Sequence, residues 1–137
     1  MAMRIIRDRL AETAMPSSVK MLSEVLVQAH PDANSRIAIG VFDGIHRGHQ
    51  QLISSMVKAA HAVGDVAILI TFDPHPAAAL DYSSPPLLTT LKERTELLEK
   101  LGLDFLIVLP FTPDIARTSA ADFVELLIRY LQMVELW

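Results

Sequence analysis

The feature of this sequence that most restricts its fold is the alternation of short apolar runs with segments of helical periodicity. The runs "IAIGVF", "VAILITF" and "DFLIVL" begin at residues 37, 66 and 104. Such runs are typical of strands buried on both faces of a parallel sheet. Parallel strands joined by helices of about ten or more residues form right-handed βαβ units. We therefore predict an α/β fold with a doubly wound parallel sheet and helices on both faces.

The segments between these runs carry the helical spacing and recognisable helix ends. Gly64 and Gly102 each follow a periodic segment as a C-terminal stop, and Ser119 and Asp122 are placed to cap the last helix. The predicted helices are 17–30, 47–63, 91–101 and 120–132, with further short strands at 4–10 and 133–137, and the first apolar run is predicted as a strand from Ile37 to Phe42.

Side chains of the last two helices divide into two groups. On the helix predicted at 91–101, Lys92 and Arg94 are expected on the solvated face. On the last helix, four side chains at helical spacing are expected in the core. They are Phe123, Leu126, Leu127 and Tyr130.

Composition limits the class of protein. At 137 residues the chain has the length of one domain, and none of its apolar runs approaches the ~20 residues that a membrane helix needs. The N-terminus lacks the continuous apolar segment of a secretory signal, and there is no Cys for a disulfide or a thiolate metal site. The net charge of −4 comes without a cluster of Lys and Arg, so nucleic acid is a poor partner. We expect a cytoplasmic protein with no membrane partner.

The stretch "GVFDGIHRGH", from Gly40 to His49, follows the first apolar run and leads into a helix. Ligands of such sheets bind beyond the carboxyl ends of the strands. Gly44 can adopt a positive φ at the exit from the strand, and Gly48 lets an anion approach the first helical turn. His46 and His49 are three residues apart and can donate to the same phosphate oxygens. The residues thus favour a phosphate or nucleotide site without a protein nucleophile.

Other interpretations of the same stretch stay open. An isolated H-x-x-H pair is often structural, and these glycines form neither G-x-G-x-x-G nor a G-K-[ST] phosphate loop. Zinc is disfavoured, because the Glu of H-E-x-x-H is missing and no Cys is present. We therefore predict no protein metal site.

Three stretches together resemble a known family. They are "GVFDGIHRGH", "TFDPHP" (71–76) and "LTTLKERTELLEKLGLDFLIVLPFT" (88–112). They are similar to the adenylyltransferase half of bacterial bifunctional riboflavin kinase/FMN adenylyltransferases, or FAD synthetases, within the nucleotidyltransferases that carry an H-x-G-H motif. The resemblance runs from about Arg36 to the end. It implies a Rossmann-like nucleotidyltransferase fold, and transfer of AMP from ATP to FMN to give FAD and pyrophosphate, with Mg²⁺ bound through the ATP phosphates.

The resemblance also implies residue roles. His46 and His49 would contact the ATP phosphates and stabilise the transition state. The nucleotide cradle would consist of Gly40, Phe42, Asp43, Gly44 and Gly48. The loop on the flavin side would consist of Phe72, Asp73, Pro74, His75 and Pro76. Asp73 and His75 suit a rigid turn without a ligand equally well, so both interpretations stay open for them.

The sequence departs from the family pattern at two places. A D-F-x-F-G-like motif followed by Arg, a later Ser/Thr-rich segment ending in Ile-Arg, and a riboflavin kinase domain are all missing after "MVELW". We expect residues 1–137 to be a single, C-terminally incomplete nucleotidyltransferase domain. Residues 10–35 exceed the usual link and are expected to form a helical insertion. An incomplete sheet exposes a strand edge, which favours self-association.

Two other functions compete with FMN adenylylation. One is a different H-x-G-H transferase, such as a cytidylyltransferase, although the D-P-H-P loop argues against it. The other is a nucleotide-binding module that does no chemistry, which the missing C-terminal motifs favour. All three functions predict small-molecule nucleotides as ligands.

Overall fold

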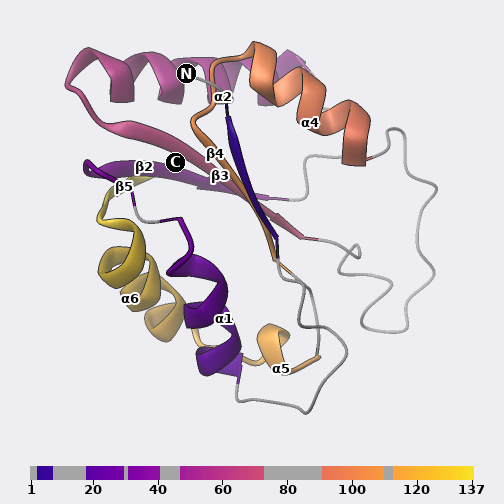
Figure 1. Ribbon diagram of the computed structural model, residues 1–137, viewed down its shortest axis with the longest axis vertical. Coiled ribbons are helices and arrows are strands. Elements are labelled where there is room, and N and C mark those ends of the chain that lie inside the picture. The colour runs from indigo at the N-terminus through magenta and orange to yellow at the C-terminus, as the bar shows by residue number, and fades with distance from the viewer. Residues whose placement is uncertain (1–2, 8–17, 30, 41–46, 73–90, 110–112) are drawn as a thin grey trace.

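The computed structural model describes residues 3–7, 18–29, 31–40, 47–72, 91–109 and 113–137. They form a five-stranded sheet in the order β1-β4-β3-β2-β5, in which every pairing is parallel (Figure 1). The strands are β1 Arg4–Arg7, β2 Ser35–Ile39, β3 Val66–Phe72, β4 Phe105–Leu109 and β5 Met133–Leu136. The helices are α1 Ser18–Leu26, α2 Arg47–Ala62, α4 Leu91–Lys100, α5 Pro113–Ala116 and α6 Ala120–Leu131. The predicted doubly wound α/β fold is confirmed.

The apolar runs form the three central strands, and the boundaries of β2 differ most from their prediction. β3 matches the run "VAILITF", and all five residues of β4 are buried. β2 begins at Ser35, two residues earlier than predicted, and Gly40 is a bend beyond its end; the predicted last residue, Phe42, is outside the described residues. Ser35 fits a buried strand because its hydroxyl donates to the Leu131 carbonyl at 2.7 Å. That hydrogen bond removes the penalty of burying a polar side chain.

The chain changes direction across the sheet at β2. From β2 it passes through α2 to β3 and through α4 to β4, with both helices on one face (Figure 1). It then returns through α5 and α6 on the opposite face, where α1 also lies, and places β5 on the other side of β2. The carboxyl end of β2 is therefore the topological switch point of the sheet.

Each face of the sheet has its own apolar cluster. On the first face α1 and α6 cover side chains such as Ile37 and Ile68, and on the second α2 and α4 cover Ala38 and Leu69. Successive strand residues thus enter opposite clusters, as the period of two requires. The core prediction for α6 is confirmed: Leu126 and Leu127 are buried, and Phe123 and Tyr130 pack against the first cluster.

α1 is part of the first cluster and does not lie apart from the domain. Leu22, Val25 and Leu26 are at most 1% exposed and belong to the same cluster as the buried leucines of α6. One side of this part of the predicted insertion therefore belongs to the core of the domain. Whether residues 10–35 are an insertion relative to other proteins stays a prediction.

Several helix ends follow the sequence signals, but the helix predicted over 17–30 is shorter and ends at Leu26. Gly64 and Gly102 have φ of +78° and +89° after α2 and α4, the left-handed conformation that favours glycine. The Ser119 hydroxyl accepts from the Asp122 N–H at 3.1 Å and caps α6. At its other end, α6 was predicted to include Gln132. The helix ends at Leu131, because Gln132 adopts the left-handed conformation with φ of 53°.

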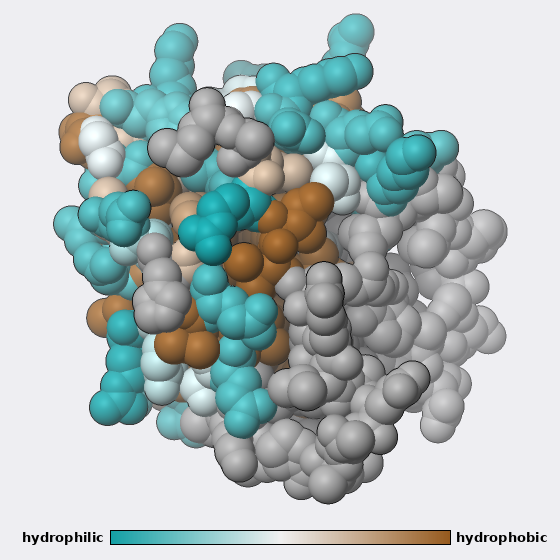
Figure 2. All heavy atoms as spheres, in the orientation of Figure 1, coloured by the Kyte–Doolittle hydropathy of each residue, from teal (hydrophilic) through white to brown (hydrophobic). Residues whose placement is uncertain are grey.

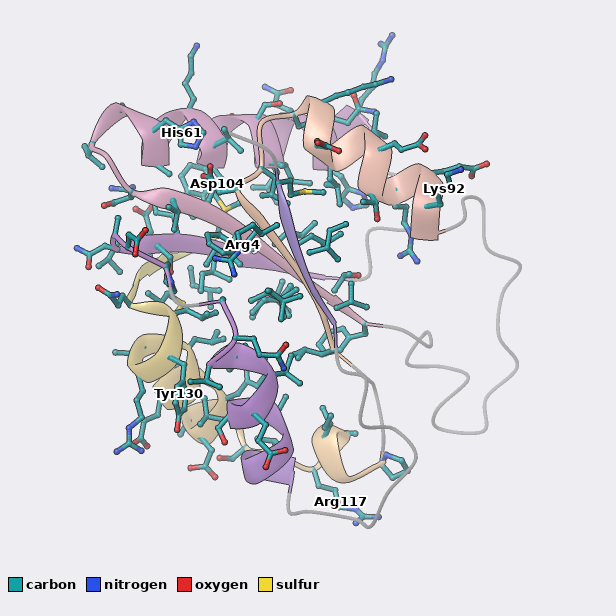
Figure 3. The ribbon with its side chains drawn as sticks, in the orientation of Figure 1. Arg4, His61, Lys92, Asp104, Arg117 and Tyr130 are labelled. Atoms are coloured by element: carbon teal, nitrogen blue, oxygen red, sulfur yellow. The ribbon has the colours of Figure 1, made fainter. Side chains whose placement is uncertain are left out.

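Polar side chains tie the amino edge of the sheet together. Asp104, just before β4, accepts from the Ala67 N–H of β3 at 2.8 Å. The same carboxylate oxygen lies 2.7 Å from Nε2 of His61, in the last turn of α2 (Figure 3). One side chain therefore fastens two strands and a helix.

Two arginines make further links near this edge. Arg36 of β2 pairs with Asp65, with Nε 3.3 Å from Oδ2, and with Glu135 of β5. Arg4 of β1 donates to the Ala29 carbonyl at 3.1 Å after the end of α1, and its guanidinium carbon lies 5.3 Å from the centroid of the Phe105 ring (Figure 3). These contacts join residues far apart in the sequence.

Both outer strands carry exposed apolar side chains. On β5, Val134 and Leu136 are 55% and 50% exposed. On β1, Ile5 is 52% exposed, and Figure 2, which views the molecule from the side of β1, shows apolar surface over that strand. Within the part of the chain that the structure describes, no helix is long and apolar enough to cross a membrane.

Candidate functional site

The candidate site lies at the carboxyl end of β2, where the sheet has its switch point. The Gly40 N–H donates to the Ile70 carbonyl at 3.0 Å, so the bonding between β2 and β3 continues one residue past Ile39. α2 begins at Arg47 on the second face of the sheet. The stretch from Gly40 to His49 thus connects the end of β2 to the N-terminus of α2. In open α/β sheets, this is the place where ligands bind.

The first turn of α2 leaves room for an anion. Arg47 and Gly48 are exposed, and a Cβ built on Gly48 would meet no atom within 4 Å. Packing within the protein therefore does not require a glycine at this position. The helix has 16 residues, so its N-terminal N–H groups and dipole favour negative charge here.

His49 occupies the third position of α2 and is partly buried. Its Nδ1 atom is buried, so the imidazole ring is turned into the molecule. The histidine thus lies in the first turn of the helix, next to Gly48 in the sequence.

Phe72, the last residue of β3, lies at the same edge but on the other face. It is in register with Leu109 at the end of β4. Its partly buried side chain packs against the first cluster, on the side of α1 and α6. Phe72 and His49 therefore share the carboxyl edge of the sheet but are on opposite faces.

The other predicted site residues are outside the described residues. Those in the nucleotide stretch are Phe42, Asp43, Gly44 and His46. Those in the flavin-side loop are Asp73, Pro74, His75 and Pro76. Among the residues that the structure describes, no group of three or more acidic, histidine or cysteine side chains is arranged to hold a metal ion.

The prediction that Arg94 lies on the solvated face of its helix is wrong. Lys92 of α4 is exposed, as expected (Figure 3). Arg94 is only 5% exposed. It precedes the buried Leu98 by four residues, so the two share the face of α4 that covers the sheet. The i, i+4 spacing of Arg94 and Leu98 indicates a shared face of the helix. The prediction of a solvated position gave more weight to the charge of Arg94.

The strand order and the switch point of the sheet define a Rossmann-like α/β domain. Comparison with known proteins gives the family. Residues 28–137 match the family model described as FAD synthetase. The chain belongs to the FAD synthetase family.

Similar proteins include bifunctional riboflavin kinase/FMN adenylyltransferases of several bacteria. That of Listeria monocytogenes is 36% identical over 96 residues, which are 69% of this chain and 31% of the relative. That of Bacillus subtilis is 35% identical over 95 residues, or 68% of this chain and 30% of the relative. That of Escherichia coli K12 is 29% identical over 105 residues, or 75% and 34%. The chain spans about a third of the length of these relatives.

A solved structure also resembles the domain. It is described as a macrolide-efflux protein from Streptococcus pneumoniae, with a TM-score of 0.67 and 30% sequence identity. The similarity covers 77% of this chain and 36% of that one. It supports the fold that the sheet order defines.

Proposed function

We propose that this chain is an FMN adenylyltransferase domain, which transfers AMP from ATP to FMN. A phosphate oxygen of FMN attacks the α-phosphorus of ATP and forms the new P–O bond of FAD. The bond between the α-phosphorus and the oxygen bridging to the β-phosphate breaks, and pyrophosphate leaves. The observation that carries the proposal is the position of the Gly40–His49 stretch at the switch point of a sheet in this family.

The proposal gives the protein groups electrostatic roles. His46 and His49 donate to the phosphate oxygens as negative charge develops there, and the first-turn N–H groups of α2 add to this stabilisation. The open space at Gly48 supports a close approach of the phosphates. The remaining cradle residues are Gly40, Phe42, Asp43 and Gly44. The flavin-side residues are Phe72, Asp73, Pro74, His75 and Pro76.

Mg²⁺ belongs to this proposal as an ion that the nucleotide brings. In this proposal the ligands of the ion are mainly phosphate oxygens and water. When bound, it neutralises phosphate charge. The proposal also places the reaction in the cytoplasm, with small-molecule nucleotides as substrates.

The test is FAD formation by the full chain from FMN and Mg·ATP, followed by chromatography with fluorescence detection. A parallel reaction uses CTP, and a thermal shift with ATP reports binding independently of chemistry. FAD made from ATP supports the proposal. Binding of ATP by a folded sample without product favours a non-catalytic nucleotide-binding module, and a preference for CTP favours another H-x-G-H transferase. Either of these results overturns FMN adenylylation by this chain.

We also propose that the chain associates with a second copy through the β5 edge. Val134 and Leu136 are about half exposed there, and the described residues place no strand on the outer side of β5. Unpaired apolar edges are templates for pairing. Analytical ultracentrifugation at about 100 µM should show a dimer. A monodisperse monomer contradicts this proposal and leaves the enzymatic one untouched.

A further inference from the structure

Trp137 continues the pairing of β5 with β2 by one residue beyond the end of β5. Its N–H donates to the Ile37 carbonyl at 2.8 Å. Because Ile37 already pairs with Leu136 in this parallel ladder, the hydrogen bond carries the register one residue further. Trp137 is thus placed opposite Ala38, which precedes Gly40 at the end of β2 by two residues. Two strand residues span only about 7 Å.

The strands β2 and β5 are the two that flank the switch point of the sheet. From β2 the chain leaves through α2 on the second face, whereas it reaches β5 from α6 on the first face (Figure 1). Ligands of open α/β sheets bind beyond the carboxyl ends of such a pair of strands. The switch point has Gly40 at one of its strand ends and Trp137 at the other.

The register also sets the face of the sheet on which Trp137 lies. Ala38 is buried in the second cluster with side chains of α2 and α4, and residues opposite each other on adjacent strands point to the same face. Trp137 therefore lies on the face of α2, the helix whose N-terminus favours negative charge. The residue is 36% exposed, so part of the indole ring is accessible.

We propose that Trp137 stacks on the adenine base of ATP. An indole ring offers a flat π-face on which a heterocyclic base stacks. With the phosphates at the first turn of α2, the adenosine half of the nucleotide extends across the switch point toward β5. The flavin-side loop begins at the end of β3, which lies on the other side of β2. The strand order thus separates the base of ATP from the flavin.

This inference rests on the proposed function, because it takes the ligand of the switch point to be a nucleotide. It goes further by assigning recognition of the base to a residue outside both the Gly40–His49 stretch and the flavin-side loop.

The first test uses Trp137 as its own reporter, because it is the only tryptophan of the sequence. The full chain is titrated with Mg·ATP and, separately, with Mg·tripolyphosphate, which has the phosphates without the base, while tryptophan emission is recorded. Stacking should quench the emission with ATP and leave it unchanged with tripolyphosphate. Equal changes with both ligands, or no change while a thermal shift shows that ATP binds, would overturn the inference.

The second test measures Kd values by isothermal titration. Trp137→Ala removes the ring and should raise the Kd for ATP by about tenfold or more, with the Kd for tripolyphosphate unchanged. Trp137→Phe keeps an aromatic face and should recover most of the ATP affinity. The matched control is Leu136→Ala, which removes an exposed apolar side chain from the opposite face of β5 and should bind ATP as the wild type does. Thermal unfolding and analytical ultracentrifugation of each variant report fold and association separately.

The other outcomes of these titrations contradict the inference in distinguishable ways. Unchanged ATP affinity in Trp137→Ala would overturn it and leave the proposed function intact. Equal losses for ATP and tripolyphosphate would show a structural role only. A loss of FMN affinity in place of ATP affinity would overturn it by assigning the ring to the flavin. A folded wild-type chain that binds no nucleotide would overturn both the inference and the proposed function.

Discussion

The two edges of the sheet use their polar residues in different ways. At the amino edge, Asp104, His61 and Arg36 are engaged in contacts within the protein. At the carboxyl edge, Gly48 faces empty space and Arg47 is exposed at the start of α2. Among the described residues, the amino edge thus carries contacts that stabilise the fold, and the carboxyl edge carries the exposed start of α2. Substitutions at the two edges should therefore affect different properties.

The largest effect is expected at the carboxyl edge, in catalysis. His49→Ala should lower the rate of FAD formation by about 10²–10³, the usual effect of removing one donor to a transition-state oxyanion. The melting temperature should change little, because His49 is only partly buried. Steady-state kinetics with Mg·ATP and FMN measure the rate. An unchanged turnover number would remove His49 from the catalytic machinery.

The amino edge should show the opposite pattern. Asp104→Ala removes the acceptor of the Ala67 N–H and the partner of His61, so it should lower the free energy of unfolding by about 1–3 kcal/mol. Nucleotide affinity at the other edge should stay the same. Urea denaturation and ATP titration measure the two properties.

Asp104→Asn is the matched control for this change. The amide oxygen can still accept from the Ala67 N–H, whereas the negative charge beside His61 is lost. The loss of stability should be smaller than in Asp104→Ala. Equal losses would mean that the carboxylate charge, and not the backbone contact, dominates at this position.

Gly48→Ala should affect stability and ATP affinity in different ways. A Cβ at this position meets no protein atom, and alanine is up to about 1 kcal/mol more favourable than glycine within a helix. The melting temperature should therefore hold or rise. ATP affinity should fall by about tenfold, because the Cβ occupies the approach of the phosphates.

Ser55→Ala, an exposed position in the middle of α2, provides the comparison for Gly48→Ala. It changes helix propensity without adding an atom near the first turn, and ATP should bind it as it binds the wild type. If Gly48→Ala also bound ATP normally, the phosphates would not approach the backbone at this residue.

The smallest effect belongs to the exposed ion pair at the amino edge. Glu135 is 44% exposed on the outer strand, so Glu135→Gln should lower the free energy of unfolding by at most about 0.5 kcal/mol. The difference should shrink further in high salt, which screens such pairs. A loss above about 1 kcal/mol would show that Arg36 needs both of its carboxylates to hold β5.

The elements themselves were predictable because their signals are local. The run "VAILITF" coincides with β3, and the glycines after α2 and α4 have the positive φ that a stop requires. The stretch that forms the candidate site also stood out, because its glycines and histidines follow an apolar run. Periodicity and helix-end chemistry depend on residues only a few positions apart.

The sequence alone predicted the five strands, the four longer helices and the residue types of the candidate site, but not the short helix α5. Tertiary structure decided which strands are neighbours, which face Phe72 packs on, and that Arg94 is buried. It also joined Arg36 to Asp65 and Glu135, which are 29 and 99 positions away. These features depend on contacts between distant segments, whose energies no local pattern contains. The switch point that places the site arises from the strand order, and that order exists only in the folded sheet.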